Sequence, residues 1–151
     1  MKKSKMKINN NKVKGFKYIV YGMTLNGVIS YIGKTKRYKV KDTIVNDKGE
    51  IIDIVIYSER WQEHLSLLDK NKHHNTLLQL VYNELKNKGV VIDFVVLELC
   101  KNDSSASNKE DRLIKKNKTL NYSGRSQLEN ELIEKIILDF FLSFFYFMLD
   151  I

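Results

Sequence analysis

The sequence predicts a small α+β domain with helices around a central three-stranded antiparallel sheet, an extra β-hairpin insertion and a C-terminal helix. Runs 16–23, 28–32 and 90–99 are rich in the β-branched and aromatic residues that favour strands. Segments 58–70 and 75–88 instead repeat their apolar residues at helical spacing. A chain of 151 residues, 43% of them hydrophobic, has the size and composition of one folded domain.

The first two strands are predicted to form a hairpin around Asn26-Gly27, because both residues tolerate a positive φ. Each arm of this hairpin carries a tyrosine, Tyr21 in the first strand and Tyr31 in the second. Gly33 follows the return strand, where the missing side chain lets the backbone turn sharply or approach a ligand. A hairpin that only filled a core would need neither this glycine nor the cations that follow it.

A second hairpin is predicted within residues 38–57, which we interpret as an insertion. Two β-rich runs are separated there by the turn-forming sequence Asn-Asp-Lys-Gly at 46–49. Two helices should follow. Ser58 can cap the first, and Asn75 can cap the second, which Gly89 would end.

The strand at 90–99 is apolar along its whole length, which predicts a central, buried position in the sheet. Residues 101–108 are predicted to form a polar loop, and residues 109–124 a short helix followed by a loop. These boundaries place residues 15–138 in one domain.

A long apolar helix is predicted from about Ser126 to the C-terminus, since nine apolar residues recur there at helical spacing. Its last part, 139–151, is apolar almost all round and forms an extension of the domain. The apolar stretch from 136 is shorter than the roughly 20 residues that cross a bilayer. We expect this helix to pack on the domain or on a second copy of the chain, as a homodimer.

The positive charge is concentrated near the N-terminus. Residues 1–41 hold twelve Lys and Arg and no Asp or Glu, whereas the other residues hold fourteen basic and eighteen acidic side chains. Such a cationic region favours binding to nucleic acid through phosphate neutralisation. Residues 1–14 are expected to form a basic tail, which alternatively serves only solubility. Five cations adjoin the hairpin and are predicted to contact the DNA backbone: Lys34, Lys36, Arg37, Lys39 and Lys41.

The single cysteine, Cys100, excludes an internal disulfide and fits a reduced compartment. The N-terminal lysines precede asparagines rather than an apolar stretch, unlike a secretory signal peptide. We therefore expect a cytoplasmic protein, in the host cell if the chain is viral, with no membrane or small-molecule substrate as partner.

Four features, in the same order along the chain, resemble the GIY-YIG endonuclease family. The likeness extends over about residues 16–138 and includes a pair of tyrosine motifs, an arginine helix and a late glutamate helix. The matching residues are Tyr21, the Tyr31-Ile32-Gly33 triplet after nine intervening residues, Arg60 and His64 in RWQEHL, and Glu129 in LENELI.

The resemblance implies a stand-alone endonuclease of homing, restriction or phage type that hydrolyses phosphodiester bonds in double-stranded DNA. It implies one Mg²⁺ or Mn²⁺ per active site, held by Glu129, since hard cations prefer oxygen ligands. Arg60 would grip phosphate oxygens in a bidentate manner. His64, Tyr21 or Tyr31 would orient the attacking water. The proton of this water would be accepted by His64, or by a tyrosine if nearby cations depress its pKa.

Two positions depart from the family pattern. Ile19 stands where the family's first glycine is expected, and Phe141 stands where many members have an asparagine, about three helical turns after the glutamate. The second departure motivates an alternative function, a catalytically inactive DNA-binding module on the same fold. A third hypothesis is a membrane-surface protein that uses the basic N-terminus and the apolar C-terminal segment.

Taken singly, each of these residues also fits an ordinary structural role. Tyr21 and Tyr31 are compatible with half-buried strand aromatics, and Arg60 and His64 with a solvated helix face. Glu129 has other glutamates beside it, as an exposed helix face often does. Only their order as a set favours an active site.

Overall fold

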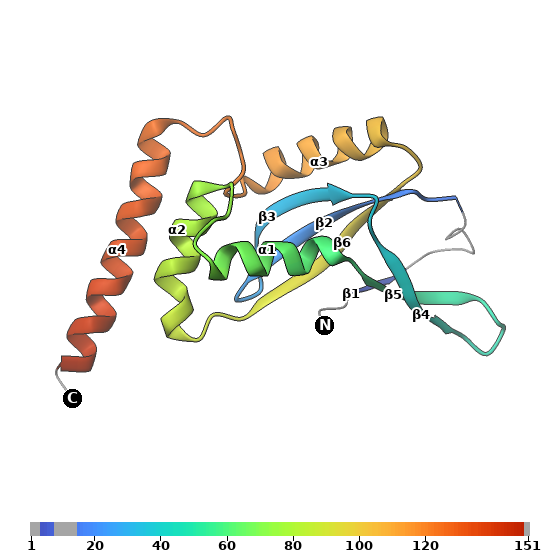
Figure 1. The fold of residues 1–151 in the computed structure, drawn as a ribbon, viewed down its shortest axis with the longest axis horizontal. Coiled ribbons are helices and arrows are strands. Elements are labelled where there is room, and N and C mark those ends of the chain that lie inside the picture. The colour runs from blue at the N-terminus through green and yellow to red at the C-terminus, as the bar shows by residue number, and fades with distance from the viewer. Residues whose placement is uncertain (1–3, 8–14, 150–151) are drawn as a thin grey trace.

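The structure is a computed structural model that describes residues 4–7 and 15–149, and it confirms the predicted α+β fold (Figure 1). Its elements alternate between two small sheets and the helices that surround them. They are β1 (Ser4–Lys7), β2 (Tyr18–Leu25), β3 (Val28–Thr35), β4 (Lys39–Val45), β5 (Ile51–Tyr57), α1 (Glu59–Asp69), α2 (Thr76–Leu85), the 3₁₀ turn η1 (Lys86–Lys88), β6 (Ile92–Cys100), α3 (Asp103–Asn117) and α4 (Gln127–Leu149).

The central sheet has the antiparallel order β3-β2-β6. The predicted hairpin turn is confirmed, with φ of 50° at Asn26 and 82° at Gly27. The prediction that 90–99 is a central strand is wrong, because β6 is the edge strand and β2 is central. β6 is nevertheless apolar because both of its faces are covered. Phe94 packs in the core below α1 and α2, and Leu97 packs on the opposite side, in the cluster formed with α3.

The predicted insertion forms a hairpin, β4 and β5, that extends away from the central sheet (Figure 1). Asn46 shapes its turn by accepting hydrogen bonds from the backbone N–H groups of Lys48 and Glu50 at 3.0 and 2.9 Å. β1 pairs with β5, so the order of this second sheet is β1-β5-β4. Within the predicted basic tail 1–14, residues 4–7 therefore form a strand; the others lie outside the described residues.

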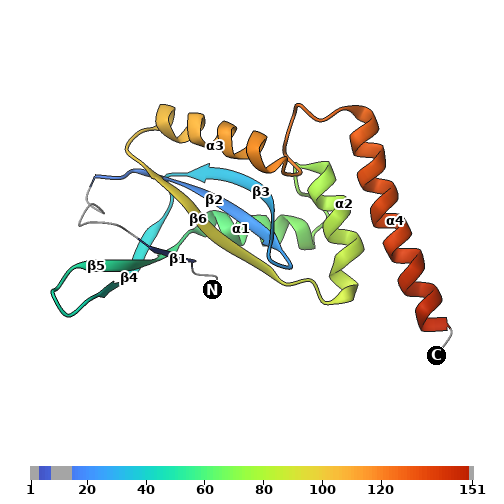
Figure 2. The same ribbon diagram turned by 180° about the vertical axis from the view of Figure 1, so that it is seen from behind.

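The caps of α1 and α2 are those that the sequence predicts. The Ser58 hydroxyl accepts from the backbone N–H of Arg60 at 3.2 Å, and the Asn75 side chain accepts from that of Leu78 at 2.8 Å. Gly89, at φ 76°, ends the turn that follows α2. In Figure 1 α1 crosses in front of the sheet, and in Figure 2 it lies behind it, so this helix covers one face.

The other face is covered by α3, where the predicted polar loop at 101–108 is wrong. The side chain of Asn102 accepts from the backbone N–H of Ser105 at 2.8 Å and so starts a helix at Asp103. Ala106 is fully buried against Val20 and Ile32 in the second core cluster. Tertiary packing of one small apolar face stabilises a helix whose sequence is otherwise polar.

The last helix, α4, is a single helix that begins after Ser126, as predicted, and continues without a break across the predicted boundary at 138–139. It stands beside α2 in both views (Figures 1 and 2). Leu138 and Glu134 of α4 face Leu80 and Glu84 of α2 across a small cavity of about 180 Å³. Over the described residues, no helix combines the length and apolar character needed to cross a bilayer.

Candidate active site

Tyr21 lies at the centre of the largest core cluster, with a side chain that is only 1% exposed. Its ring meets Trp61 of α1 edge-on, at a centroid distance of 6.2 Å. Its hydroxyl lies 2.7 Å from Nε2 of His64, one turn further along α1. The central strand and α1 thus bring two of the predicted catalytic residues into direct contact.

Gly33 creates the space for this phenol. It lies within β3, directly opposite Tyr21 in the ladder, so of its two predicted roles the sharp turn is wrong, whereas the approach of a ligand stays a prediction. A Cβ at this position would lie 2.6 Å from the Tyr21 hydroxyl oxygen and 2.8 Å from the ring carbon that bears it. The glycine is needed because the phenol crosses the neighbouring backbone.

We expect Gly33→Ala to lower the free energy of unfolding by about 1–3 kcal/mol, because the new methyl group overpacks the Tyr21 phenol. Gly22→Ala is the matched control on β2, where a Cβ would meet movable methyl groups of Ile29 and Val95 at 3.2 Å. Urea denaturation of both variants measures the difference. Equal losses would show that the Tyr21 phenol does not depend on Gly33.

Tyr31 forms a second tyrosine–histidine pair next to the first. Its hydroxyl lies 3.1 Å from Nε2 of His74, and its ring meets the edge of the His64 ring at 5.1 Å. The rings of His73 and His74 stack at 4.4 Å. The structure therefore places two tyrosines and three histidines in one cluster, which we call the Tyr–His cluster: Tyr21, Tyr31, His64, His73 and His74.

Arg60 borders the Tyr–His cluster and is partly exposed. Its guanidinium donates to the Glu63 carboxylate at 2.8 Å. The same carboxylate pairs with Arg37 through both of its oxygens, each at 2.7 Å. The two arginines together lower the pKa of Glu63 to about 2. The Glu63 carboxylate thus occupies guanidinium N–H groups of Arg37 and Arg60 that could otherwise donate to a phosphate.

Both phenols are protonated at neutral pH. Burial raises the pKa of Tyr21, the Tyr31 phenol adds to the rise, and the Arg60 guanidinium opposes it without cancelling it. Burial also raises the pKa of Tyr31 against the same guanidinium. The depressed tyrosine pKa that proton acceptance would require is therefore not found in the free protein. Burial, with Arg60, lowers the pKa of His64 to about 3, so its ring is neutral.

Glu129, the predicted metal ligand, does not join the Tyr–His cluster. It is exposed in the first turn of α4, where its carboxylate accepts from the backbone N–H of Ser126 at 2.8 Å. In return the Ser126 hydroxyl accepts from the backbone N–H of Glu129 at 3.1 Å. This reciprocal pair is a capping box, which explains the residue by its role in starting the helix.

A different carboxylate, Glu110 of α3, lies within electrostatic range of both tyrosines. It is partly buried, which raises its own pKa, and its charge contributes to the raised pKa values of Tyr21, Tyr31 and Lys34. The sequence contains a signal for it, since the pattern Glu-x-x-Leu-Ile occurs both at 110–114 and at 129–133. The first copy lies on the helix that packs against the sheet, and the second lies on α4.

Asn121 lies on the open edge of β3, next to Tyr31. Its side chain donates to the carbonyl of Ile32 at 2.6 Å and accepts from the Ile32 backbone N–H at 3.3 Å. It follows Glu110 at nearly the separation by which Phe141 follows Glu129. Phe141 departs from the GIY-YIG pattern only if Glu129 is the glutamate of that pattern. If Glu110 is that glutamate, Asn121 stands near the expected position of the asparagine.

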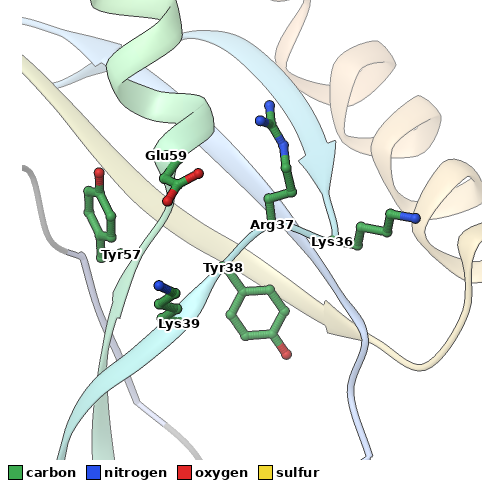
Figure 3. Close-up of a pocket in the computed structure, with 6 residues that line it drawn as sticks. All are labelled: Lys36, Arg37, Tyr38, Lys39, Tyr57 and Glu59. Carbon is green, nitrogen blue, oxygen red and sulfur yellow. The ribbon is translucent and has the colours of Figure 1, made fainter.

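The five predicted DNA-contacting cations divide into two kinds. Two are paired within the protein: Lys34 donates to Asp103 at 2.6 Å, and Arg37 pairs with Glu63. The others, Lys36, Lys39 and Lys41, are exposed, and the Lys41 ammonium lies over the Tyr57 ring at 5.7 Å from its centroid. Lys36, Arg37 and Lys39 border a cavity of about 240 Å³ where β3 gives way to β4, together with Tyr38, Tyr57 and Glu59 (Figure 3).

Comparisons of this chain with models of known families, with curated proteins and with solved structures find no match. The likeness to GIY-YIG endonucleases therefore rests on the residues of this sequence, and the activity that it implies stays a prediction.

Proposed function

We propose that this chain is a metal-dependent DNA endonuclease of the GIY-YIG type. The observation that carries the proposal is the Tyr–His cluster with Arg60 on its border and Glu110 within electrostatic range of both tyrosines. These residues combine donors for a phosphate, neutral groups that orient a water, and a carboxylate. A core built only for stability would not need this combination of polar groups.

Within this proposal Arg60 binds the scissile phosphate, which replaces the Glu63 carboxylate as its partner. Tyr21 and Tyr31 act as protonated phenols that orient the phosphate or the attacking water by hydrogen bonding. The raised tyrosine pKa values support this role over that of a general base. His64 is neutral and holds Tyr21 in place from the buried side.

Glu110 replaces Glu129 as the proposed ligand of one Mg²⁺ or Mn²⁺. The described residues contain no group of three or more His, Cys, Asp or Glu side chains arranged to hold a metal. A single carboxylate still fits Mg²⁺, which keeps several waters and uses substrate phosphate oxygens as ligands. When bound, such an ion neutralises charge that develops on the phosphate during hydrolysis. The partly buried Glu110 carboxylate supplies the protein oxygen for it.

The DNA backbone is proposed to lie along Lys36, Lys39 and Lys41. We expect Lys36→Gln with Lys39→Gln to make the slope of log Kd against log salt shallower by about 1–2, since each lost phosphate contact removes about 0.9. Lys115→Gln with Lys116→Gln, at the exposed end of α3, removes the same charge elsewhere. Fluorescence anisotropy with a duplex at several salt concentrations measures both slopes. Equal changes in the two variants would contradict a localised DNA surface.

The proposal extends to a homodimer through α4, because this helix exposes a row of large apolar side chains that a second copy would cover. We expect a dimer in sedimentation velocity runs, and a monomer when Leu132 and Ile136 are changed to glutamate. A wild-type monomer at all protein concentrations would contradict it. The exposed residues are Leu128, Leu132, Ile136, Leu138, Leu142 and Leu149.

A further inference from the structure

A chain of short hydrogen bonds connects the backbone of the α1–α2 loop to the hydroxyl of Tyr21. The backbone N–H of Asn75 donates to Nδ1 of His73 at 3.0 Å. Nε2 of His73 lies 2.7 Å from Nδ1 of His64. Nε2 of His64 lies 2.7 Å from the Tyr21 hydroxyl oxygen. Each ring thus uses both of its nitrogens.

The direction of every bond in this chain follows from the first one. A backbone amide only donates, so Nδ1 of His73 carries a lone pair, and the proton of a neutral ring is on its Nε2. That proton is donated to His64, whose Nδ1 must therefore accept. The proton of His64 is then on Nε2 and is donated to the hydroxyl oxygen of Tyr21. The reverse direction would leave His73 with no ring proton, as an anion.

The surroundings keep both rings neutral. His64 is fully buried and His73 is 7% exposed, and their ring planes, inclined by 23° with centroids 5.0 Å apart, suit an edge-to-edge hydrogen bond. Burial lowers the pKa of His64 to about 3 and that of His73 to about 4. A charged ring in this chain would also force two N–H groups to face each other.

The loop that carries His73 is held firmly by Gln79 of α2. The Gln79 side chain accepts from the backbone N–H of His73 at 2.9 Å and donates to the carbonyl of Leu68 and to the Asn83 side chain, both at 3.0 Å. Asn75 in turn caps α2, so the position of its backbone amide is tied to the start of that helix. The first donor of the chain is therefore fixed by secondary structure.

We propose that His73 is a positioning residue that, through His64, fixes the direction in which the Tyr21 hydroxyl points. The oxygen of Tyr21 accepts on its buried side, so its own proton is directed away from the histidines. This O–H is then available to donate to a phosphate oxygen held by Arg60. The catalytic consequence rests on the proposed nuclease function, whereas the hydrogen-bond directions rest on the fold alone.

Nitrogen NMR of the full chain, labelled with ¹⁵N-histidine and recorded at pH 7, tests the hydrogen-bond directions. We expect His64 and His73 each to show a protonated Nε2 and an unprotonated Nδ1. His73→Leu removes the donor, so His64 should partly change to the Nδ1-protonated tautomer. His73→Gln keeps an N–H donor at the position of Nε2 and should preserve the His64 spectrum. A wild-type His64 protonated on Nδ1 would overturn the proposal, and this result does not require either variant to fold.

The catalytic consequence is measured by plasmid cleavage at saturating DNA. We expect His73→Leu to lower kcat about 10–100-fold with little change in KM, and His73→Gln to recover most of the loss. Equal losses in the two variants would overturn the positioning role. If the wild-type protein shows the expected tautomers but does not cleave DNA, the nuclease function fails while the assigned hydrogen-bond directions stand. If it cleaves DNA but the tautomers differ, the inference fails and the function stands.

Discussion

Replacing Glu110 with glutamine is expected to lower DNA cleavage more than about 100-fold while DNA affinity stays within about threefold of the wild type. Loss of a residue that only orients a metal ligand already costs about 10–100-fold, so loss of the ligand itself should cost more. The substitution removes the charge that would hold the ion but keeps the volume of the side chain. Single-turnover cleavage, together with anisotropy in the presence of Ca²⁺, measures both quantities.

Glu129→Gln is the matched control, because it makes the same chemical change in the other copy of the Glu-x-x-Leu-Ile pattern. Glutamine can also complete the capping box, so we expect a loss of only about 0.3–1 kcal/mol from the removed charge at the start of α4, with cleavage intact. Loss of cleavage in Glu129→Gln, with activity retained in Glu110→Gln, would return the metal site to the position that the sequence first indicated.

Acid is expected to destabilise the fold steeply, because His64 and His73 are neutral when folded. In the unfolded chain each regains the ordinary histidine pKa of about 6.5 and binds a proton below that pH. The folded pKa values are about 3 and about 4, so the unfolded state takes up more protons throughout the interval between. The stability contributed by the neutral rings is thus fully present above about pH 6.5 and is lost as the pH falls. The free energy of unfolding should fall by about 1.4 kcal/mol per pH unit for each ring.

Urea denaturation between pH 7 and 4.5 measures this slope. Glu63 does not affect the slope in this pH range. Because its pKa is lowered when folded, the stability that it contributes is lost only below about pH 4.5. Glu110 acts in the opposite sense because its pKa is raised, so the measurement is best made in Glu110→Gln. Burial also lowers the pKa of His74, so His73→Gln removes one of three contributing rings and should make the slope shallower without abolishing it. A free energy of unfolding that does not change across this window would contradict the buried, neutral pair.

The parts of the fold that local chemistry determines could be predicted from the sequence. The Asn26-Gly27 turn, the caps at Ser58 and Asn75 and the end of the turn η1 at Gly89 each depend on residues within one turn of each other. The start of α3 could not be predicted in this way. Its surface is polar, and it is stabilised by a small buried face that meets a sheet from a different part of the chain.

In the candidate site, too, some residues could be predicted from the local sequence, whereas the roles of others depend on tertiary packing. Tyr21 and His64 come into contact, and both lie on elements that the sequence identifies. Glu110 and Glu129 share one local pattern, and only packing distinguishes the residue within electrostatic range of the tyrosines from the residue that caps a helix. His73 carries no local signal at all, because its role depends on a loop amide and on a ring in another helix.

The most direct test of the central claim is incubation of purified protein with supercoiled plasmid in Mg²⁺ and in EDTA, beside Glu110→Gln. The proposed nuclease predicts nicked or linear DNA only with Mg²⁺ and wild-type protein, and intact supercoiled plasmid in the other two reactions. Plasmid that stays supercoiled with Mg²⁺, while the same protein retards it in a gel, would contradict the enzyme and identify a catalytically inactive DNA-binding module.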